Sequence, residues 1–461
     1  YLMPRGVLAG SVGAANVASI SDPTAMWTNP AGLARSGQQL SMDFLMPVQS
    51  VDYTRMDAAG DFEPTVSSTS APLPVPGFAY SDTLGSDLTW GAALFVPTAS
   101  LHSWPRCVVD PESDGVNRGP GPCPLGQRGA PTRHTLLSIA GSGFAFFSGG
   151  LAWRPNHWLS LGAVATAVAG RFVVDVVMST CDGGVLCASG DYERYDAEAH
   201  IEVPYFIRPS GALGMQIDLE GFRAGLALVA PFQLAGEASL EVQLPPGVGA
   251  FEGAELTNTT ADLEAGFPMI IRAGLGYDFS DRLSLETQFT WEQWSVQDAM
   301  RVYPQDISIE SPVLGEYEMG PIEMERGMQD SFAYGVGLSY QATAALQLRG
   351  GTMYERSALP DEYMTILTPD SDKLMVGAGF SYGLGPMLGM FDEVLVDVTA
   401  GHLFMRNISV RDTELYQPAA LRPPPPECDE WQSGCATPLG NGDYKVEASY
   451  VGVGARMFLG E

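Results

Sequence analysis

Four arginines occupy positions at which they could bind an acidic ligand. In segments where apolar and polar residues alternate, these arginines fall on the polar face; they are Arg171, Arg208, Arg272 and Arg349. A guanidinium in a partly desolvated pocket binds a carboxylate through paired, charge-assisted hydrogen bonds. The same faces also carry the carboxylates Asp175, Glu202, Glu286 and Glu292. The alternative is therefore that the arginines form ion pairs with these carboxylates and fill a polar interior.

The six cysteines form three close pairs, each inside a polar segment rich in Pro or Gly. The pairs are Cys107 with Cys123, Cys181 with Cys187, and Cys428 with Cys435. An even number of cysteines in such segments favours disulfides and an oxidising, extracytoplasmic compartment. A zinc site usually needs His among converging ligands, and the five His lie far from these pairs. We expect three local disulfides and no metal site, although the acidic loops could bind Ca²⁺.

The residue types for catalysis are present but are not arranged for it. No G-x-S-x-G motif follows a strand and opens a helix. His134, His157, His200 and His402 lie in different segments without a neighbouring catalytic partner. The net charge of −30, with only 24 Lys and Arg, also excludes nucleic acid as a partner. We therefore expect neither an enzyme nor a cofactor.

The segments that carry the four arginines and the neighbouring carboxylates are predicted to be long β-strands. In 283–296, Leu283, Leu285 and Phe289 are apolar, whereas the interleaved Glu286 and Gln288 are polar. Segments 267–279 and 331–340 repeat this period of two, which is the period of a strand with two different faces. With 53 Gly and only 17% charged residues spread over 461 positions, the chain is predicted to be all-β.

The connections between these strands alternate in length. Short turns, such as Pro155 to His157, alternate with long acidic loops, such as 300–326 and 411–443, and all six Cys fall on the long-loop side. Tyr and Trp recur at strand ends, as in the aromatic girdles of membrane barrels, and this disfavours a soluble sandwich. We predict a transmembrane antiparallel β-barrel of about 14 strands, in the outer membrane of a Gram-negative bacterium.

The N-terminal residues 1–37 follow a different pattern from the barrel region 38–461. They are rich in Ala, Gly and Ser, and they contain Asn29, Pro30, Ala31 and Gly32. This run predicts a tight turn in which Asn29 bonds its own backbone, Pro30 fixes φ, and Gly32 takes a left-handed conformation. We expect this segment to be a hatch inside the lumen; the alternative is an ordinary N-terminal loop. Because the chain begins at Tyr1 and not at Met, we also expect that a leader has been removed.

Four segments, in order, resemble the FadL family of outer-membrane transporters for long-chain fatty acids and other hydrophobic molecules. They span nearly the whole chain: residues 10–35 with Asn29 to Gly32; Trp90-Gly91 through Pro97; Phe267-Pro268 through the W-x-x-W-S of Trp291 to Ser295; and Pro360-Asp361 with Thr368 to Lys373. The long loops differ from the apolar helical loops of well-known members, which leaves the identity of the ligand open.

This resemblance implies a fourteen-stranded barrel closed by the hatch, with a hydrophobic ligand bound above it. The ligand would leave sideways through the wall at a kink in the third strand, which here falls between Gly91 and Pro97. The alternative is that Pro97 only ends the strand at the membrane interface. Arg171 stands where the resemblance places a cation facing the ligand.

The resemblance predicts passive uptake of hydrophobic molecules. The alternative is a structural barrel that carries a surface protein or serves as an assembly platform, because the acidic, Cys-rich loops would suit a protein partner. We expect contacts with outer-membrane lipids and lipopolysaccharide in either case.

Overall fold

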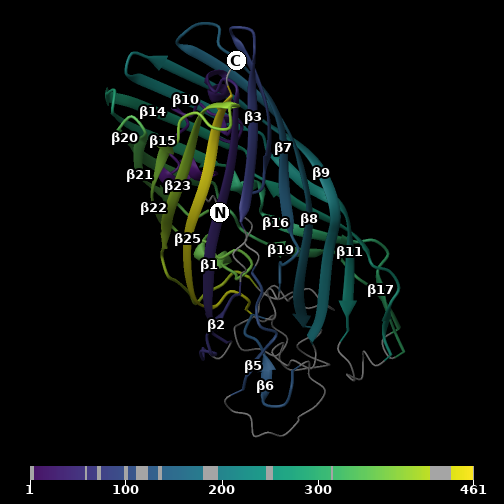
Figure 1. The fold of residues 1–461 in the computed structure, drawn as a ribbon. Helices are drawn as coiled ribbons and strands as arrows, with labels where there is room; N and C mark the ends of the chain where they lie inside the picture. The colour runs from purple at the N-terminus through teal and green to yellow at the C-terminus, as the bar shows by residue number, and fades with distance from the viewer. Residues whose placement is uncertain are drawn as a thin grey trace.

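The computed structural model describes residues 5–57, 60–69, 74–97, 102–110, 123–132, 138–179, 196–244, 253–312, 315–415 and 438–459. Fourteen antiparallel strands form a closed wall, because the first strand pairs with both the second and the last (Figure 1). In order around the wall they are β1 (Gln39–Arg55), β3 (Val75–Leu84), β4 (Leu88–Phe95), β7 (Gly143–Trp153), β8 (Leu159–Ser179), β9 (Asp196–Leu219), β10 (Phe222–Val229), β14 (Ile270–Ser280), β15 (Leu283–Glu292), β20 (Ser331–Gln341), β21 (Leu346–Glu355), β22 (Lys373–Gly383), β23 (Phe391–Met405) and β25 (Gly442–Leu459).

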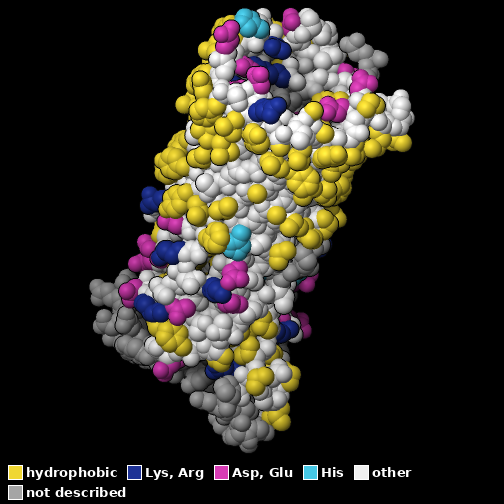
Figure 2. Space-filling model, turned by 60° about the vertical axis from the view of Figure 1, so that its left-hand side comes forward, with side chains coloured by type: hydrophobic (Ala, Val, Ile, Leu, Met, Phe, Trp, Pro, Cys, Tyr) yellow, Lys and Arg dark blue, Asp and Glu magenta, His cyan; other side chains and the backbone are white. Residues whose placement is uncertain are grey.

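The predicted alternation is confirmed on the wall strands. On β14, Leu275 and Tyr277 are exposed on the outer face, while Arg272 is buried on the inner face. On β15, Glu286 and Gln288 are likewise buried inside. On the face drawn in Figure 2, exposed apolar side chains gather in a belt across the upper part of the barrel, with charged side chains above and below it. Such a belt is the lipid-facing surface of a membrane barrel. Separately, no described helix is long and apolar enough to cross a membrane.

The two ends of the barrel differ as expected. One end, at the top of Figure 1, carries short turns and is here called the turn end; the opposite end is the loop end. Further strands extend the wall at the loop end or lie in its loops: β2 (Val66–Ser67), β5 (Cys107–Val109), β6 (Gln127–Gly129), β11 (Phe232–Gln243), β12 (Glu255–Leu256), β13 (Thr260–Phe267), β16 (Ala299–Pro304), β17 (Ser308–Ser311), β18 (Gly315–Glu318), β19 (Ile322–Glu325) and β24 (Ile408–Val410). Two short 3₁₀ helices, η3 (Trp294–Val296) and η4 (Asp361–Tyr363), also lie in these connections.

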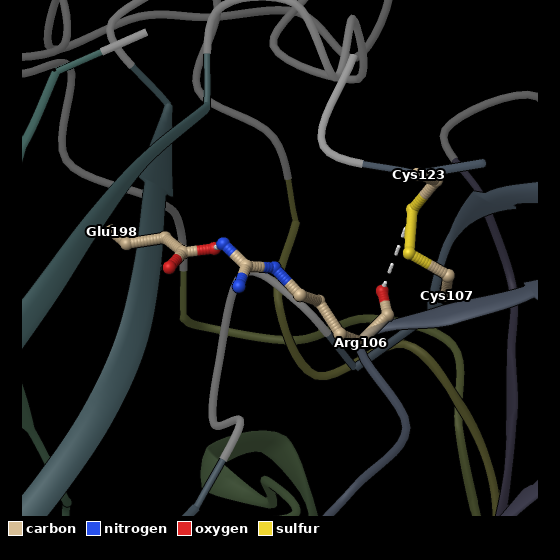
Figure 3. Close-up of a disulfide and its surroundings, with 4 residues drawn as sticks. All are labelled: Arg106, Cys107, Cys123 and Glu198. Atoms are coloured by element: carbon tan, nitrogen blue, oxygen red, sulfur yellow. Dashed lines mark hydrogen bonds and ion pairs between the residues drawn. A yellow bond between two sulfur atoms is a disulfide. The ribbon is translucent and has the colours of Figure 1, made fainter.

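A disulfide joins Cys107 to Cys123 across the small β5–β6 hairpin, with the two Cα atoms 5.7 Å apart. Next to it, Arg106 reaches to Glu198 on β9 and ties this hairpin to the wall (Figure 3). The other predicted pairs, Cys181 with Cys187 and Cys428 with Cys435, lie outside the described residues.

The loop end also contains a buried histidine, His102, with an exposed fraction of only 2%. Neither ring nitrogen has a hydrogen-bond partner in the described part of the chain. Burial disfavours the charged imidazolium and lowers the pKa of His102 to about 4. In the unfolded chain the pKa is near 6.5, so between these values the unfolded state binds more protons than the folded state.

We therefore expect the protein to lose stability as the pH falls from about 6.5 to about 4, by roughly 3 kcal/mol. Thermal unfolding in detergent at a series of pH values measures this loss. His102→Leu should flatten the profile, whereas His157→Gln, in an exposed turn, should leave it unchanged. If His102→Leu still loses stability between about pH 6.5 and about pH 4 as the unaltered protein does, His102 is not the group responsible.

The N-terminal segment lies against the inner faces of the wall strands. It contains α1 (Val7–Ser11), α2 (Ala25–Thr28) and the 3₁₀ helix η1 (Pro30–Arg35). On β15, Gln288 Oε1 accepts hydrogen bonds from the backbone N–H groups of Asn16 and Val17, at 3.3 and 3.1 Å. On β25, the Tyr450 hydroxyl donates to the carbonyl of Gly10 at 2.8 Å. The segment is thus bound to strands on different sides of the lumen; that it blocks the lumen as a separate hatch stays a prediction.

Asn29 and Gly32 have different roles in this segment. Asn29 is fully buried, and its Oδ1 accepts from the N–H of Ala31, which is the bond to its own backbone expected from the sequence. This bond caps the 3₁₀ helix η1, whereas the sequence predicted only a tight turn here. Its Nδ2 donates to the carbonyls of Val17 and Met215, at 2.8 and 3.0 Å. The expected left-handed conformation of Gly32 is wrong, because its φ is not positive. A Cβ at Gly32 would instead overlap the carbonyl oxygen of Ile20, so this glycine permits close packing.

Candidate functional site

A largely apolar cavity lies between the N-terminal segment and the loops at the loop end. Its volume is about 390 Å³, within the range of small-molecule binding sites. From the N-terminal segment it is lined by Arg5, Gly6, Met26 and Trp27. From the wall and its loop-end extensions the apolar lining includes Phe95, Phe144, Phe146, Phe232, Leu234 and Phe267, and from the loops Met328, Leu359 and Leu367.

The aromatic side chains of this cavity form a continuous track of ring contacts. It runs from Trp27 to Phe95 at 4.6 Å between centroids, then through Phe146 to Phe232. Phe232 and Phe267 stack at 4.3 Å with only 7° between their planes. These rings come from helix α2 and from strands far apart in sequence, and each can bind an apolar or aromatic ligand through its face or edge. The track therefore provides one connected hydrophobic binding surface.

A buried ion cluster holds the loop that covers the cavity. Lys373 is 1% exposed; its Nζ lies 2.9 Å from Glu355 Oε1 and 2.5 Å from Asp370 Oδ1. The Ser357 hydroxyl donates to Asp370 Oδ2 at 2.9 Å, so both ends of the segment 357–370 are fixed. Because Leu359 and Asp370 line the cavity, this cluster positions its roof.

Arg326 is the cation at the loop end of this cavity. It lies between β19 and β20, outside the wall strands, and only 5% of it is exposed. Its Nη2 donates to Thr368 Oγ1 at 2.6 Å, and no carboxylate among the described residues forms an ion pair with it. Burial lowers the pKa of Arg326 to about 10, so the guanidinium is still charged at neutral pH. A buried cation that faces a cavity without a counter-ion is suited to bind an anionic group.

Three further charged side chains border the cavity nearer the N-terminal segment, namely Arg5, Asp43 and Glu292. The guanidinium of Arg5 lies over the ring of Phe95, 5.7 Å from its centroid. Glu292 Oε2 accepts from Trp294 Nε1 at 2.8 Å, whereas its buried Oε1 has no hydrogen-bond partner among the described residues. The cavity is therefore apolar along its length, with charged groups at both ends.

The four arginines predicted to bind ligand do not converge, and none of them lines this cavity. Arg171, on β8, bonds Glu202 at 2.8 and 2.9 Å, and Arg349, on β21, bonds Gln347 at 2.8 Å. Arg272, on β14, is buried on the inner face, and Arg208, on β9, bonds the carbonyl of Ile207 at 3.0 Å. Their role in ligand binding stays a prediction. The cavity arginines, Arg5 and Arg326, lie outside the alternating strands, where strand periodicity gives no signal.

The predicted lateral opening lies beside the cavity, on β4. This strand pairs with β3 and with β7 through Phe95, so the ladder around Gly91 is continuous. Gly91 faces Leu33 and Met26 of the N-terminal segment. Pro97 follows the end of β4 and lines the cavity. An opening between Gly91 and Pro97 stays a prediction.

Known proteins resemble this chain in fold and, more weakly, in sequence. A structure of a Pseudomonas aeruginosa FadL homologue superposes with a TM-score of 0.70 at 15% identity, covering 99% of both chains. The P. putida toluene transporter TodX superposes with a TM-score of 0.67 at 15% identity, covering 100% of both chains. The 47 kDa outer membrane protein of Pasteurella multocida (strain Pm70) is 28% identical over 172 residues, which are 37% of this chain and only 35% of that protein.

The family described as outer membrane protein transport protein (OMPP1/FadL/TodX) matches residues 142–424, which is more than half of the chain. The matched region contains most of the wall strands and both sides of the Phe232–Phe267 stack. Together with the closed barrel and the apolar belt, this match shows that the chain belongs to the OMPP1/FadL/TodX family of outer-membrane transport proteins.

Proposed function

We propose that this protein is a channel for the passive uptake of hydrophobic molecules, which bind in the aromatic-lined cavity and leave sideways through the barrel wall. The observation that carries the proposal is the connected aromatic track from Trp27 to Phe267 inside a closed barrel. Proteins of similar fold include toluene transporters, and an aromatic track suits such ligands as well as alkyl chains.

The charge distribution favours a hydrophobic acid, such as a long-chain fatty acid, within this class. Arg326 places one buried positive charge at the loop end of the cavity, without a carboxylate partner among the described residues. The carboxylate of the ligand would bind there, and the chain would lie along the rings. Binding of Ca²⁺ or lipopolysaccharide at the acidic loops stays a separate prediction.

Uptake of radiolabelled toluene and palmitate by a Gram-negative host that lacks its own transporter of this family tests the proposal. Phe232→Ala/Phe267→Ala removes the stacked pair inside the cavity and should weaken ligand affinity by about 2–3 kcal/mol, roughly a hundredfold. The matched control is Phe289→Ala/Phe332→Ala. These two residues form a stacked pair on β15 and β20, on the outer side of the wall and away from the cavity, with centroids 6.0 Å apart. Equal effects of the two double variants, or no uptake by the unaltered protein, would refute the proposal.

A further inference from the structure

The hydrogen-bond ladder of the wall is interrupted between β9 and β11. Towards the turn end, β9 pairs with β10 up to Ala212 and Val229. Towards the loop end, pairing of β9 with β11 begins at Glu202 and Ser239. Residues 203–210 and 231–238, all within the described chain, form no backbone pairs with one another. Each strand keeps its other neighbour in this stretch, so the interruption affects only the side on which β9 and β11 face each other.

The cause is a mismatch in the in-and-out alternation of the two strands. On β10, Leu226 and Leu228 face outward, whereas on β11 the even-numbered Phe232 and Leu234 line the cavity. The alternation of this strand therefore shifts by one residue at Ala230 and Pro231.

The in-and-out alternation of β9 also shifts by one residue, but nearer the loop end than the shift at Ala230 and Pro231. Val203 and Phe206 are both buried, while Tyr205 is exposed, and the β8–β9 register shifts at the same place. Directly opposed residues of two antiparallel strands must share a face. If the pairing seen on both sides of the gap continued through it, each residue of β9 there would face a residue of β11 that points to the other side of the wall. The two strands therefore cannot pair between the two shifts.

Prolines reinforce this interruption. Pro204 and Pro209 on β9 and Pro231 on the facing strand have no N–H to donate to a ladder. The carbonyl of Gly211 accepts from the N–H of Ala230 at 2.8 Å, so the backbone of Gly211 faces the neighbouring strand. Because this direction repeats every second residue, the nitrogen of Pro209 also faces the seam.

The interrupted seam lies between the cavity and the outer surface of the barrel. On its inner side, Ser210, Gly211 and Phe232 line the cavity. On its outer side, Tyr205 and Ile207 are 86% and 69% exposed, so apolar side chains face the membrane beside the gap. A ligand at the aromatic track would therefore meet the wall at a place where no backbone ladder joins the two strands.

Arg208 lies across this seam. Its Nη1 donates to the carbonyl of Ile207 at 3.0 Å, on its own strand. Its Nη2 would lie 3.2 Å from a Cβ placed on Gly236 of β11. The guanidinium thus reaches the facing strand beside Gly236, where an added Cβ would be in tight contact with it.

We propose that ligands leave the cavity for the membrane between β9 and β11, through residues 203–210 and 231–238, and that Arg208 bounds this exit. This inference rests on the proposed function and assigns its exit route. Passage needs only side-chain movement and rupture of the Ser210 to Ala230 hydrogen bond, 3.0 Å long, because no ladder has to open.

A cross-link across the seam tests this route. Arg208→Cys/Gly236→Cys is joined by a short bismaleimide after the protein has folded, so folding is not affected. The matched control is Leu213→Cys/Leu228→Cys, which joins two residues that already face each other in the paired part of the wall. Unaltered protein treated with the reagent serves as the second control. Binding of palmitate and toluene is measured on purified protein, and their transfer into lipid is measured in proteoliposomes.

We expect the seam cross-link to abolish transfer while binding is retained, and the control cross-link to change neither. Normal transfer by the seam-cross-linked protein would overturn the exit route and leave the proposed function intact. Absence of binding and transfer in the unaltered protein would refute the proposed function itself.

Discussion

Removal of residues 5–32 is expected to convert the closed barrel into an open pore, with discrete conductance steps in planar bilayers where the unaltered protein shows none. The segment is bound by hydrogen bonds to the inner faces of several strands, for example through Glu286, whose Oε1 accepts from the N–H of Ala18 at 2.6 Å. A barrel of fourteen strands is wider than the eight-stranded barrels that side chains alone can fill. Unchanged conductance after the deletion would show that this segment is not the plug.

A single substitution should give a graded form of the same effect. Gly214 on β9 faces the segment so closely that an added Cβ would overlap Asn29 Oδ1. Gly214→Val should therefore displace η1 and increase conductance. The matched control is Gly149→Val on β7, where an added Cβ meets no atom within 4 Å. Equal conductance of the two variants would contradict the proposed docking of η1.

Arg326→Gln is expected to weaken palmitate binding by about 2–3 kcal/mol, roughly 30- to 100-fold, and to leave binding of methyl palmitate nearly unchanged. Palmitate loses the counter-ion of its charged carboxylate. Methyl palmitate is uncharged, so its binding does not depend on a counter-ion. Arg301→Gln is the matched control, because Arg301 lies in a partly exposed ion pair with Glu323. Competition binding on purified protein measures both ligands.

Arg326 also makes a prediction about stability without ligand. Its lowered pKa means that folding buries a charge at a cost. Arg326→Met should therefore leave the Tm of the empty protein unchanged or raise it, even though the same variant binds palmitate poorly. A large fall in Tm, or equal losses of acid and ester binding, would show that Arg326 supports the fold and does not recognise a head group.

The barrel could be predicted from the sequence because its signal is local. A period of two along β14 and β15 shows which residues face lipid, and it placed Glu286 and Gln288 correctly inside. The alternation of short turns with long loops marked where each strand begins and ends, and the strands could then be counted. The bond of the Asn29 side chain to its own backbone could also be predicted, because it forms within three residues, but the 3₁₀ helix that it caps was not predicted.

The cavity could not be predicted because it is formed by residues distant in sequence. Phe144, Phe232 and Phe267 come from three different strands, and no local pattern indicates that their rings meet. Arg326 lies in a loop without periodicity, so the sequence contains no signal for it. The alternation of apolar and polar residues identified only arginines on the wall strands, such as Arg171. A signal for the β9–β11 seam was present, however, because Pro204, Pro209 and Pro231 interrupt strands that otherwise read as continuous.

The most direct test of the account is native mass spectrometry of the purified protein, followed by extraction and identification of whatever is bound. The account predicts one hydrophobic molecule per barrel, retained by the Phe289→Ala/Phe332→Ala control and lost in the Phe232→Ala/Phe267→Ala variant. An empty barrel that takes up neither palmitate nor toluene and instead retains a protein partner at one copy per barrel would contradict it, and would favour the assembly platform.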